Sequence, residues 1–404
     1  MALSQLLDNE PTEHPMSQAF DASRSLTALE QDSTIIAVIE MSQSKWLVAA
    51  IVPGIKRQPL KKLDADAEAL FKLLHRWRKE AEQAGYPIKR VVVAYEAGRD
   101  GFWLARRLRL RDVEAYVIHA TSIAVSREHR RAKTDRLDTE LLLRVLLGWL
   151  RGEKRHCSMV AIPTIEEEDA KRPNRERAGL VSEQTRIVNQ IKAILIRFGI
   201  RSFRPKLRKA EEQLKGLRTA EGPALPENTR AELCRHLARL RTLGEQIQAI
   251  EKERLQRLKA DHGRKKGSNA MVQLTARVVG IGVETADMLV NEVFSHQFRD
   301  RRAVARYAGL TGSPDESGKR RREKGLARAG NARVRASVIQ LAWRFLIFQK
   351  NSALAQWFQT RTADGRGDIR KTMIVALARK LLIALWRLVT TGELSDGIVL
   401  RPAS

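Results

Sequence analysis

The sequence is poor in cysteine and has no long uninterrupted apolar stretch. Its 404 residues include two cysteines, Cys157 and Cys234, which are far apart and show no CxxC spacing. This argues against a disulfide framework and a zinc site, so we expect both thiols to be small buried side chains. No stretch reaches the roughly 18 apolar residues that a membrane span requires. Even the most apolar helical pattern is interrupted, by Arg379 and Lys380, so we expect no membrane partner.

The first residues also lack the features of an export signal. Residues 1–32 are polar and mildly acidic, with no basic start, apolar core or cleavage site. We expect them to form a flexible tail, and we expect the protein to remain inside the cell.

Positive charge is what the sequence has in excess. Lys and Arg number 74 against 47 Asp and Glu, which gives a formal net charge of +27. Arginine is concentrated in the runs RRLRLR (106–111), REHRRAKTDR (127–136) and KRRREK (319–324). Such an excess requires a polyanion to screen it, and the planar arginine fork suits bidentate contact with phosphate. Nucleic acid is therefore the expected partner. The alternative, a basic surface that contacts only water, would have basic and acidic residues evenly mixed.

Residues 33–152 have the pattern of an α/β domain. Four apolar or β-branched runs predict strands, at 34–40, 45–54, 89–96 and 114–119. Three segments with helical periodicity lie between and after them, at 64–84, 101–111 and 134–150. A strand pair that leads into alternating strands and helices predicts a mixed sheet with helices packed on it.

The rest of the chain is predicted to be helical. Charged and Pro-containing sequence from 151 to 177 predicts a linker. Within a connector at 153–265, segments 178–200 and 228–260 predict a long antiparallel helical pair of coiled-coil type, either a dimerisation arm or an intramolecular hairpin. In a C-terminal domain at 266–404, helices are predicted near 270–278, 284–293, 300–307, 331–349 and 370–390. A loop from 309 to 331 is long enough to predict a functional or disordered segment.

Four acidic residues fall where a metal site can be assembled. Glu40 and Glu96 each end a predicted strand, and Asp135 and Asp138 share one face of the helix that begins near residue 134. Carboxylates at adjacent strand ends and on a helix face can hold two hard divalent cations, which suit phosphodiester cleavage. The alternative for Asp135 and Asp138 is a pair of first-turn carboxylates favoured by the helix dipole.

The segments VIEMSQSKW, YEAGRDGFW and AKTDRLDTELL resemble the N-terminal RuvC-like DEDD domain of insertion-sequence transposases described as bridge-RNA-guided recombinases. That resemblance implies an RNase H-like fold and a site for Mg²⁺ (or Mn²⁺). Its acidic positions correspond to Glu40, Glu96, Asp135 and Asp138. The sequence departs from the family pattern at Glu40, where the family usually has aspartate, and the extra methylene changes the metal spacing expected there.

A serine near the C-terminus lies just before a basic run. Ser317 in ESGK is followed by Gly318, which lets the backbone approach a phosphate, and by basic side chains that can neutralise it. The alternative is a flexible Ser-Gly turn before a solvated basic run. The basic positions expected to contact nucleic acid are Lys319, Arg320, Arg321, Arg322, Lys324 and Arg328.

The block from VVGIGVETADMLVNEV through ESGK to RKTMIVALARKLLIALW is similar to the C-terminal transposase domain of the same family. There a serine in the loop before the basic run is the proposed nucleophile, which corresponds to Ser317, with Ser313 as the weaker candidate. Together the two resemblances cover residues 34–150 and 270–390.

The resemblance implies a transposase or recombinase that cuts and rejoins donor and target DNA through a serine. It also implies a noncoding guide RNA, a homodimer or tetramer, and a prokaryotic cytoplasm with nucleoid association. Two alternatives remain open: a RuvC-like, metal-dependent nuclease of branched DNA that uses water as the nucleophile, and a basic nucleic-acid-binding protein without catalysis.

Overall fold

A computed structural model of the chain describes residues 29–123, 135–153, 157–261, 267–317, 320–326, 330–363, 365 and 367–402. The predicted tail, up to residue 28, lies outside the described residues. Contacts divide the chain into two units, the first ending at Glu166 and the second beginning at Glu167. Each unit has its own buried core.

The first unit is built on a mixed six-stranded sheet with the order β3-β2-β1-β4-β5-β6. The central pair, β1 and β4, is parallel, as are β4 and β5, whereas the other pairs are antiparallel. The strands are β1 (Thr34–Met41), β2 (Lys45–Ile51), β3 (Leu60–Asp64), β4 (Arg90–Glu96), β5 (Glu114–Ile118) and β6 (Met159–Val160).

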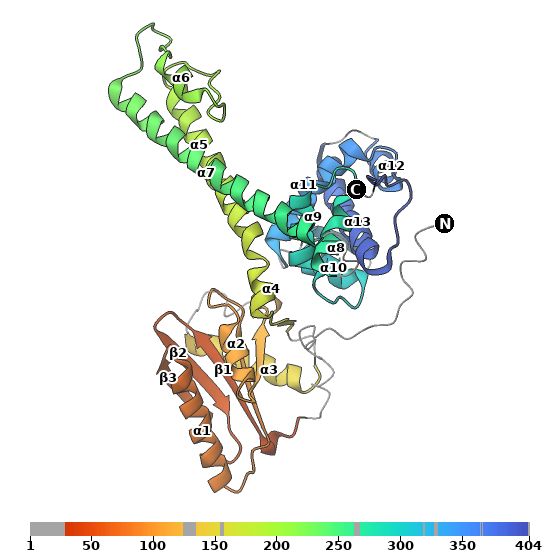
Figure 1. Cartoon of the computed structure of the whole chain (residues 1–404). Helices are drawn as coiled ribbons and strands as arrows, with labels where there is room; N and C mark the ends of the chain where they lie inside the picture. Colours follow the sequence, from red (N-terminus) through yellow and green to blue (C-terminus); the bar gives the residue numbers. More distant parts are fainter. Residues whose placement is uncertain are drawn as a thin grey trace. The chain divides into compact units, whose positions relative to one another are not determined.

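Helices cover both faces of this sheet (Figure 1). Helices α1 (Ala67–Gln83) and α2 (Trp103–Arg109) pack on one face, and α3 (Asp135–Leu150) packs on the other. Helix α1 begins where the Asp66 carboxylate accepts hydrogen bonds from two backbone amides, and it buries Leu70, Leu73, Leu74 and Trp77 at helical spacing. The predicted mixed sheet is confirmed.

Two strands of the sheet were not predicted. Strand β3 (LKKLD) carries charged residues and no apolar run, and it forms because β2 offers it a free edge, where exposed lysines are tolerated. Strand β6 is two residues long and carries no pattern of its own. The expectation of buried cysteines is confirmed for Cys157 and is wrong for Cys234, which is exposed on a helix.

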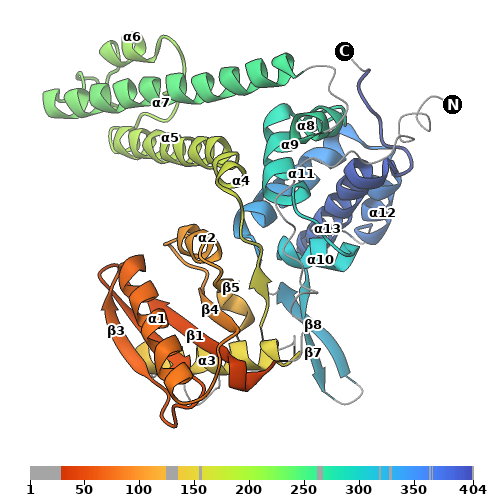
Figure 2. The same ribbon diagram turned by 60° about the horizontal axis from the view of Figure 1, so that its bottom comes forward.

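The second unit begins with a helical arm in which α5 (Arg172–Ile196) and α7 (Glu227–Ala260) lie side by side (Figures 1 and 2). The chain passes through the short helix α6 (Ala210–Lys215) at the far end and returns. Ile187, Ile191 and Leu195 of α5 share one apolar cluster with Leu233 and Leu237 of α7. The pair is therefore an intramolecular hairpin.

The predicted linker at 151–177 is wrong over its second half. Helix α4 (Ile165–Asp169) forms there, and α5 already begins at Arg172. Pro173 lies in the first turn of α5, where a missing amide hydrogen has no cost, and the surrounding Glu and Arg residues favour helix.

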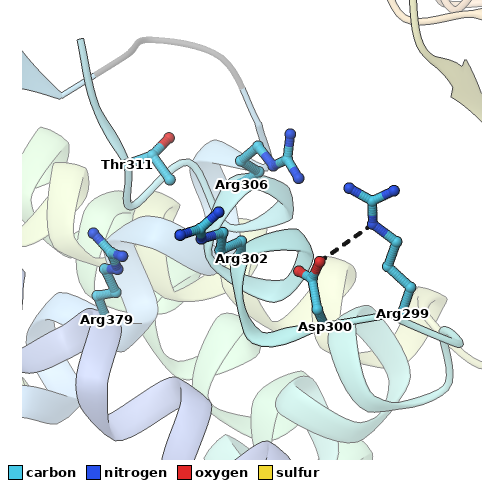
Figure 3. Close-up of a pocket in the computed structure, with 6 residues that line it drawn as sticks. All are labelled: Arg299, Asp300, Arg302, Arg306, Thr311 and Arg379. Atoms are coloured by element: carbon cyan, nitrogen blue, oxygen red, sulfur yellow. Dashed lines mark hydrogen bonds and ion pairs between the residues drawn. The ribbon is translucent and has the colours of Figure 1, made fainter. Parts of the chain in front are cut away.

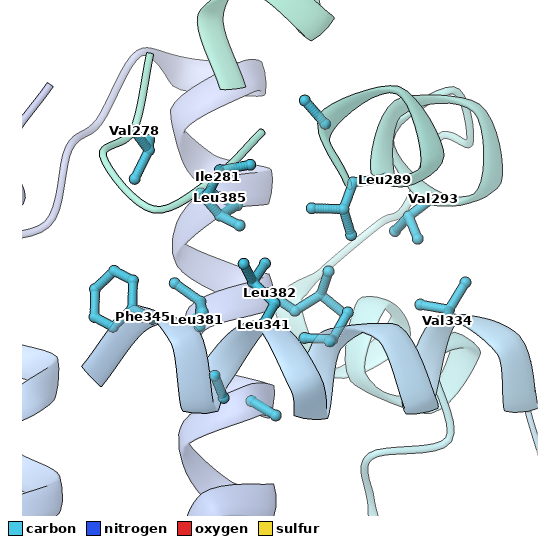
Figure 4. Packing of buried hydrophobic residues seen from close by; sticks show 14 of the residues in the cluster. Val278, Ile281, Leu289, Val293, Val334, Leu341, Phe345, Leu381, Leu382 and Leu385 are labelled. Carbon is cyan, nitrogen blue, oxygen red and sulfur yellow. The ribbon is translucent and has the colours of Figure 1, made fainter. Parts of the chain in front are cut away.

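The rest of the second unit packs helices around one apolar core (Figure 4). Leu341 and Phe345 meet Leu381 and Leu385 there, with Leu289 beside them. The elements are α8 (Ser268–Ala276), α9 (Val283–Leu289), a π turn η5 (Val290–Phe294), α10 (Arg301–Tyr307), α11 (Ala332–Phe348), α12 (Ala353–Arg361) and α13 (Gly367–Thr391). Helix α12 was not predicted. No helix within the described ranges is long and apolar enough to cross a membrane.

Most of the predicted loop at 309–331 is a β-hairpin rather than structureless chain. Strands β7 (Gly312–Ser317) and β8 (Arg320–Leu326) pair in antiparallel fashion (Figure 2). Hydrophobic alternation did not indicate these strands because their residues are mainly charged. The signal that was available is a two-residue spacing, Gly318-Lys319, between runs of opposite charge.

Candidate functional site

Glu40 and Glu96 lie side by side at the carboxyl ends of the two central strands. The parallel register pairs Ile39 with Tyr95, so the next residue on each strand is one of these glutamates. Neighbouring strands are about 4.8 Å apart. Glu40 is half-buried and Glu96 is exposed. The structure therefore brings together the two strand-end carboxylates that the sequence indicated.

Both glutamates belong to the sheet face that α3 covers. Side chains alternate between the two faces of a strand. Ile36 and Val38 of β1, and Val92 and Ala94 of β4, are in the cluster that packs against α3. Glu40 and Glu96 continue that alternation by two residues, which assigns them to the same face.

Helix α3 begins at the same edge of the sheet. Near its end, the Trp149 ring lies 5.0 Å from the Tyr116 ring, within β5. One turn earlier, the carbonyl of Val145 lies 4.0 Å from the Cys157 thiol, and the next residue, Ser158, accepts a hydrogen bond from the His119 amide just beyond β5. Trp149 therefore lies beside the middle of β5 and Val145 lies nearer its carboxyl end, so the start of α3 points toward the carboxyl ends of the strands.

Asp138 lies seven residues before Val145, about 10 Å further in that direction along the helix axis. It is half-buried, and Asp135 occupies the first position of α3. The side chain of Asp135 lies outside the described residues. The two strand ends and the helix start that carry the four predicted positions therefore lie toward one edge of one face of the sheet.

The donor set of these four residues consists of oxygen atoms alone, which is the chemistry that Mg²⁺ and Mn²⁺ take. Among the side chains that the structure describes, no three His, Cys, Asp or Glu groups are close enough together to hold a metal. Glu40, Glu96 and Asp138 are in that set and do not form such a group, and the Asp135 side chain lies outside it, so the four-residue site stays a prediction.

Ser317 is the last residue of β7. Its Cα pairs with that of Arg320, the first residue of β8. Next in register, Glu316 pairs with Arg321 and Asp315 with Arg322, so acidic β7 faces basic β8. Ser313 lies where the register shifts between Gly312 and Pro314.

Two of the predicted basic positions, Lys319 and Arg328, lie outside the described residues. For the other four, the structure describes the backbone alone: Arg320, Arg321, Arg322 and Lys324.

A buried polar cluster lies at the base of this hairpin. Glu292 is 1% exposed and accepts two hydrogen bonds from Arg175, at 2.8 and 3.2 Å. Asn331, just after the hairpin, donates its amide hydrogen to the Tyr307 carbonyl at 2.7 Å, and its side chain reaches Glu292 at 3.4 Å. Burial is the largest single effect and raises the pKa of Glu292, but the hydrogen bond from Arg175 and the positive charges of Arg175, Lys171 and Arg333 together hold the pKa below its usual value. The members of this cluster come from distant segments of the chain, so no local sequence pattern indicates it.

Comparison with known proteins gives consistent matches. Residues 272–359, from α8 to α12 and including the β7–β8 hairpin, match the model of the transposase IS116/IS110/IS902 family. The chain is 40% identical over 386 residues to the putative transposase y4rJ of Sinorhizobium fredii, which covers 93% of this chain and 97% of that relative. It is 26% identical over 231 residues to the transposase for insertion sequence element IS1111A of Coxiella burnetii, 57% of this chain and 61% of that relative. The chain therefore belongs to the IS116/IS110/IS902 family of transposases.

Proposed function

We propose that this insertion-sequence transposase cuts and rejoins donor and target DNA with Ser317 as the nucleophile. The observation that carries the proposal is the position of Ser317 at the end of β7, beside Arg320, inside the segment that matches the family model. A residue at the end of a hairpin strand can approach a DNA backbone, and neighbouring guanidinium groups can neutralise the phosphate that it attacks.

The proposed chemistry is a reversible exchange of phosphodiester bonds. The Ser317 oxygen loses its proton to a base and forms a bond to phosphorus, while the bond to the 3′ oxygen breaks and that oxygen leaves as a hydroxyl group. The DNA remains attached to the serine through its 5′ phosphate. A 3′ hydroxyl of the other DNA then attacks the same phosphorus and releases the serine. No external energy source is needed, because one phosphodiester bond replaces another.

The carboxylates of the first unit supply the second part of the proposal. Glu40, Glu96, Asp135 and Asp138 would hold Mg²⁺ or Mn²⁺ in an RNase H/RuvC-like domain, from the same or a neighbouring subunit. When bound, the cation supplies charge neutralisation at the reacting phosphate. The convergence of β1, β4 and α3 on one edge of the sheet supports this assignment.

The proposal includes partners that the resemblance implies. A noncoding RNA would select the donor and target DNA by base pairing, and the protein would act as a homodimer or tetramer. The net charge of +27 supports a polyanionic partner.

The test is a search for a covalent adduct. The protein, co-expressed with its flanking RNA, is supplied with donor DNA, target DNA and Mg²⁺, and protease-sensitive protein–DNA adducts are then measured. We expect an adduct with the wild type and with the matched control Ser313→Ala, and none with Ser317→Ala. Loss with Ser313→Ala instead would move the nucleophile to the bulge of β7. Metal-dependent cleavage without any adduct would favour a branched-DNA nuclease, and absence of both would favour a binding protein.

A further inference from the structure

A cavity of about 430 Å³ opens beside the base of the hairpin (Figure 3). It is formed by α10 and the two residues before it, by the residue that precedes β7 and by the middle of α13. Its lining residues are Arg299, Asp300, Arg302, Arg306, Thr311 and Arg379. Five of these six side chains are charged, so the cavity is built for a charged occupant rather than an apolar one.

The charge balance of the cavity favours an anion. Four arginines face one aspartate, which leaves three positive charges in excess. Asp300 is already engaged: it accepts a hydrogen bond from the Ala303 amide at 2.7 Å and one from Arg299 at 3.2 Å. These contacts, the Ala303 amide above all, hold the pKa of Asp300 below its usual value, so it is ionised at neutral pH.

The remaining three arginines are available. Within the described part of the chain, Arg302, Arg306 and Arg379 form no ion pair, and all three are exposed. Figure 3 shows them around the cavity together with Thr311. A guanidinium group binds phosphate oxygens with two parallel hydrogen bonds, so three of them around one open cavity suit a phosphodiester group.

The position of the cavity indicates which nucleic acid it meets. Six residues of extended chain lead from Thr311 to Ser317, a span of about 20 Å at most at about 3.3 Å per residue. DNA advances about 3.4 Å per base pair, so this span corresponds to about six base pairs. DNA that presents a phosphate to Ser317 and runs along the hairpin toward its base therefore passes within reach of the cavity.

We propose that the cavity lined by Arg302, Arg306 and Arg379 binds a backbone phosphate of the DNA that Ser317 cuts, about six base pairs or fewer from the cut. The inference rests on the proposed function, because the role of Ser317 fixes which DNA lies there. It gives these arginines a positioning role: they fix the register of the DNA on the hairpin and do not touch the reacting phosphorus.

The test compares two double variants of equal charge, each with one arginine from α10 and one from α13. The cavity variant is Arg302→Gln with Arg379→Gln. The control is Arg301→Gln with Arg370→Gln; both residues are exposed, lie outside the cavity and form no ion pair within the described part of the chain. Both are made in Ser317→Ala protein, so binding of donor DNA duplex is measured without cleavage. Exposed arginines without ion pairs leave the fold intact when replaced, so the cavity variant reports binding.

The expected result has two parts. The cavity variant loses at least about tenfold in affinity for the duplex, and its plot of log affinity against log salt concentration becomes shallower by about one. The second part uses a set of duplexes in each of which one backbone phosphate is replaced by an uncharged methylphosphonate. The control variant should bind one of these duplexes more weakly, the one whose replaced phosphate lies within about six base pairs of the cut. The affinity of the cavity variant should not change with that replacement.

Three results would overturn the inference. Equal losses of duplex affinity in the two double variants would mean that the loss comes from the lower net charge and not from the cavity. Loss of affinity for the flanking RNA with normal affinity for the duplex would assign the cavity to RNA. A methylphosphonate effect that the cavity variant retains would mean that the cavity holds no phosphate. The proposed function is tested by a separate measurement: if it is wrong, wild-type protein forms no serine adduct.

Discussion

Asp138 and Glu140 lie two residues apart on α3 in different surroundings. Asp138 is half-buried at the sheet edge, whereas Glu140 is exposed and pairs with Arg136 at 3.1 Å, one helical turn away. We expect Asp138→Asn to lower the rate of strand exchange at least about a hundredfold, because it removes a charge that the proposed metal site needs. Affinity for donor DNA should not fall. Glu140→Gln removes the same charge from the same helix and should keep nearly full activity; equal losses in the two variants would contradict the metal-site assignment.

His296 is a titratable group whose charge the fold suppresses. Burial, and then the nearby charge of Lys171, lower its pKa to about 4, although Glu167 and Glu292 oppose this. Its Nε2 lies 3.0 Å from the Tyr307 hydroxyl. The unfolded chain, with a histidine pKa of about 6.5, takes up this proton at a higher pH than the folded protein does. The stability is therefore complete above about pH 6.5 and is lost as the pH falls toward 4.

We expect the free energy of unfolding of the second unit to decrease by about 2 kcal/mol from this histidine alone between about pH 7 and pH 5. His296→Gln can retain a hydrogen bond to Tyr307 but does not titrate, so its loss over the same range should be smaller by that amount. Urea unfolding at the two pH values measures the difference. The same pH dependence in the variant would mean that His296 is not the group responsible.

At the scale of elements, the helical arm is attached through a buried arginine. Arg254 of α7 is 3% exposed and forms ion pairs with Glu284 and Asp287 of α9, the latter at 3.0 Å. It also donates a hydrogen bond to Asn174 of α5, at 3.0 Å. One guanidinium group thus connects both helices of the arm with the helical core.

We expect Arg254→Ala to destabilise the second unit by about 3 kcal/mol or more, because two carboxylates lose their buried partner. Arg257→Ala is the matched control: the side chain lies one turn away, is exposed, and should change stability by less than about 0.5 kcal/mol. Chemical denaturation measures both. If the two variants were equally stable, the buried ion pairs would not hold the arm.

The base of the β7–β8 hairpin depends on close backbone contact. Gly330 has φ +90°, and a Cβ atom there would lie 2.5 Å from the Gly309 nitrogen and 2.6 Å from the Arg306 carbonyl oxygen. We expect Gly330→Ala to cost about 2 kcal/mol or more, since backbone atoms must move. Gly325 of β8 also has positive φ but has open space around it, so Gly325→Ala should cost about 1 kcal/mol.

Thermal unfolding compares these two glycine variants, and strand exchange gives a second measurement. The displaced hairpin base in Gly330→Ala should lower formation of the proposed Ser317 adduct more than Gly325→Ala does. Equal stability of the two variants would contradict the close contact at Gly309.

For the whole molecule, the net charge of +27 makes nucleic-acid binding strongly dependent on salt. Each phosphate contact adds about 0.9 to the slope of log affinity against log salt, so about six contacts lower affinity roughly a thousandfold between about 50 and 200 mM salt. We expect at least this loss for donor DNA, measured by equilibrium binding with flanking RNA omitted. A loss below about tenfold would mean that the basic surface is not the binding surface.

The sequence by itself determined the elements that carry an apolar run or an apolar periodicity. The apolar runs of β1 and β4 predicted both strands and placed Glu40 and Glu96 at their ends, and both strands are buried along most of their length. The apolar seams of α5 and α7 likewise predicted the arm. Local periodicity carries this information because burial of one face requires it.

Tertiary structure decided the rest. Strand β3 and the β7–β8 hairpin are charged and depend on a pairing partner, which periodicity does not report. The apolar seams of α5 and α7 also did not determine whether the two helices pair within one chain. The cavity joins Arg302 to Arg379, and the buried cluster joins Arg175 to Glu292, across long stretches of chain. Such pairs form only when the helices pack, because the free energy that brings them together comes from apolar cores elsewhere in the sequence.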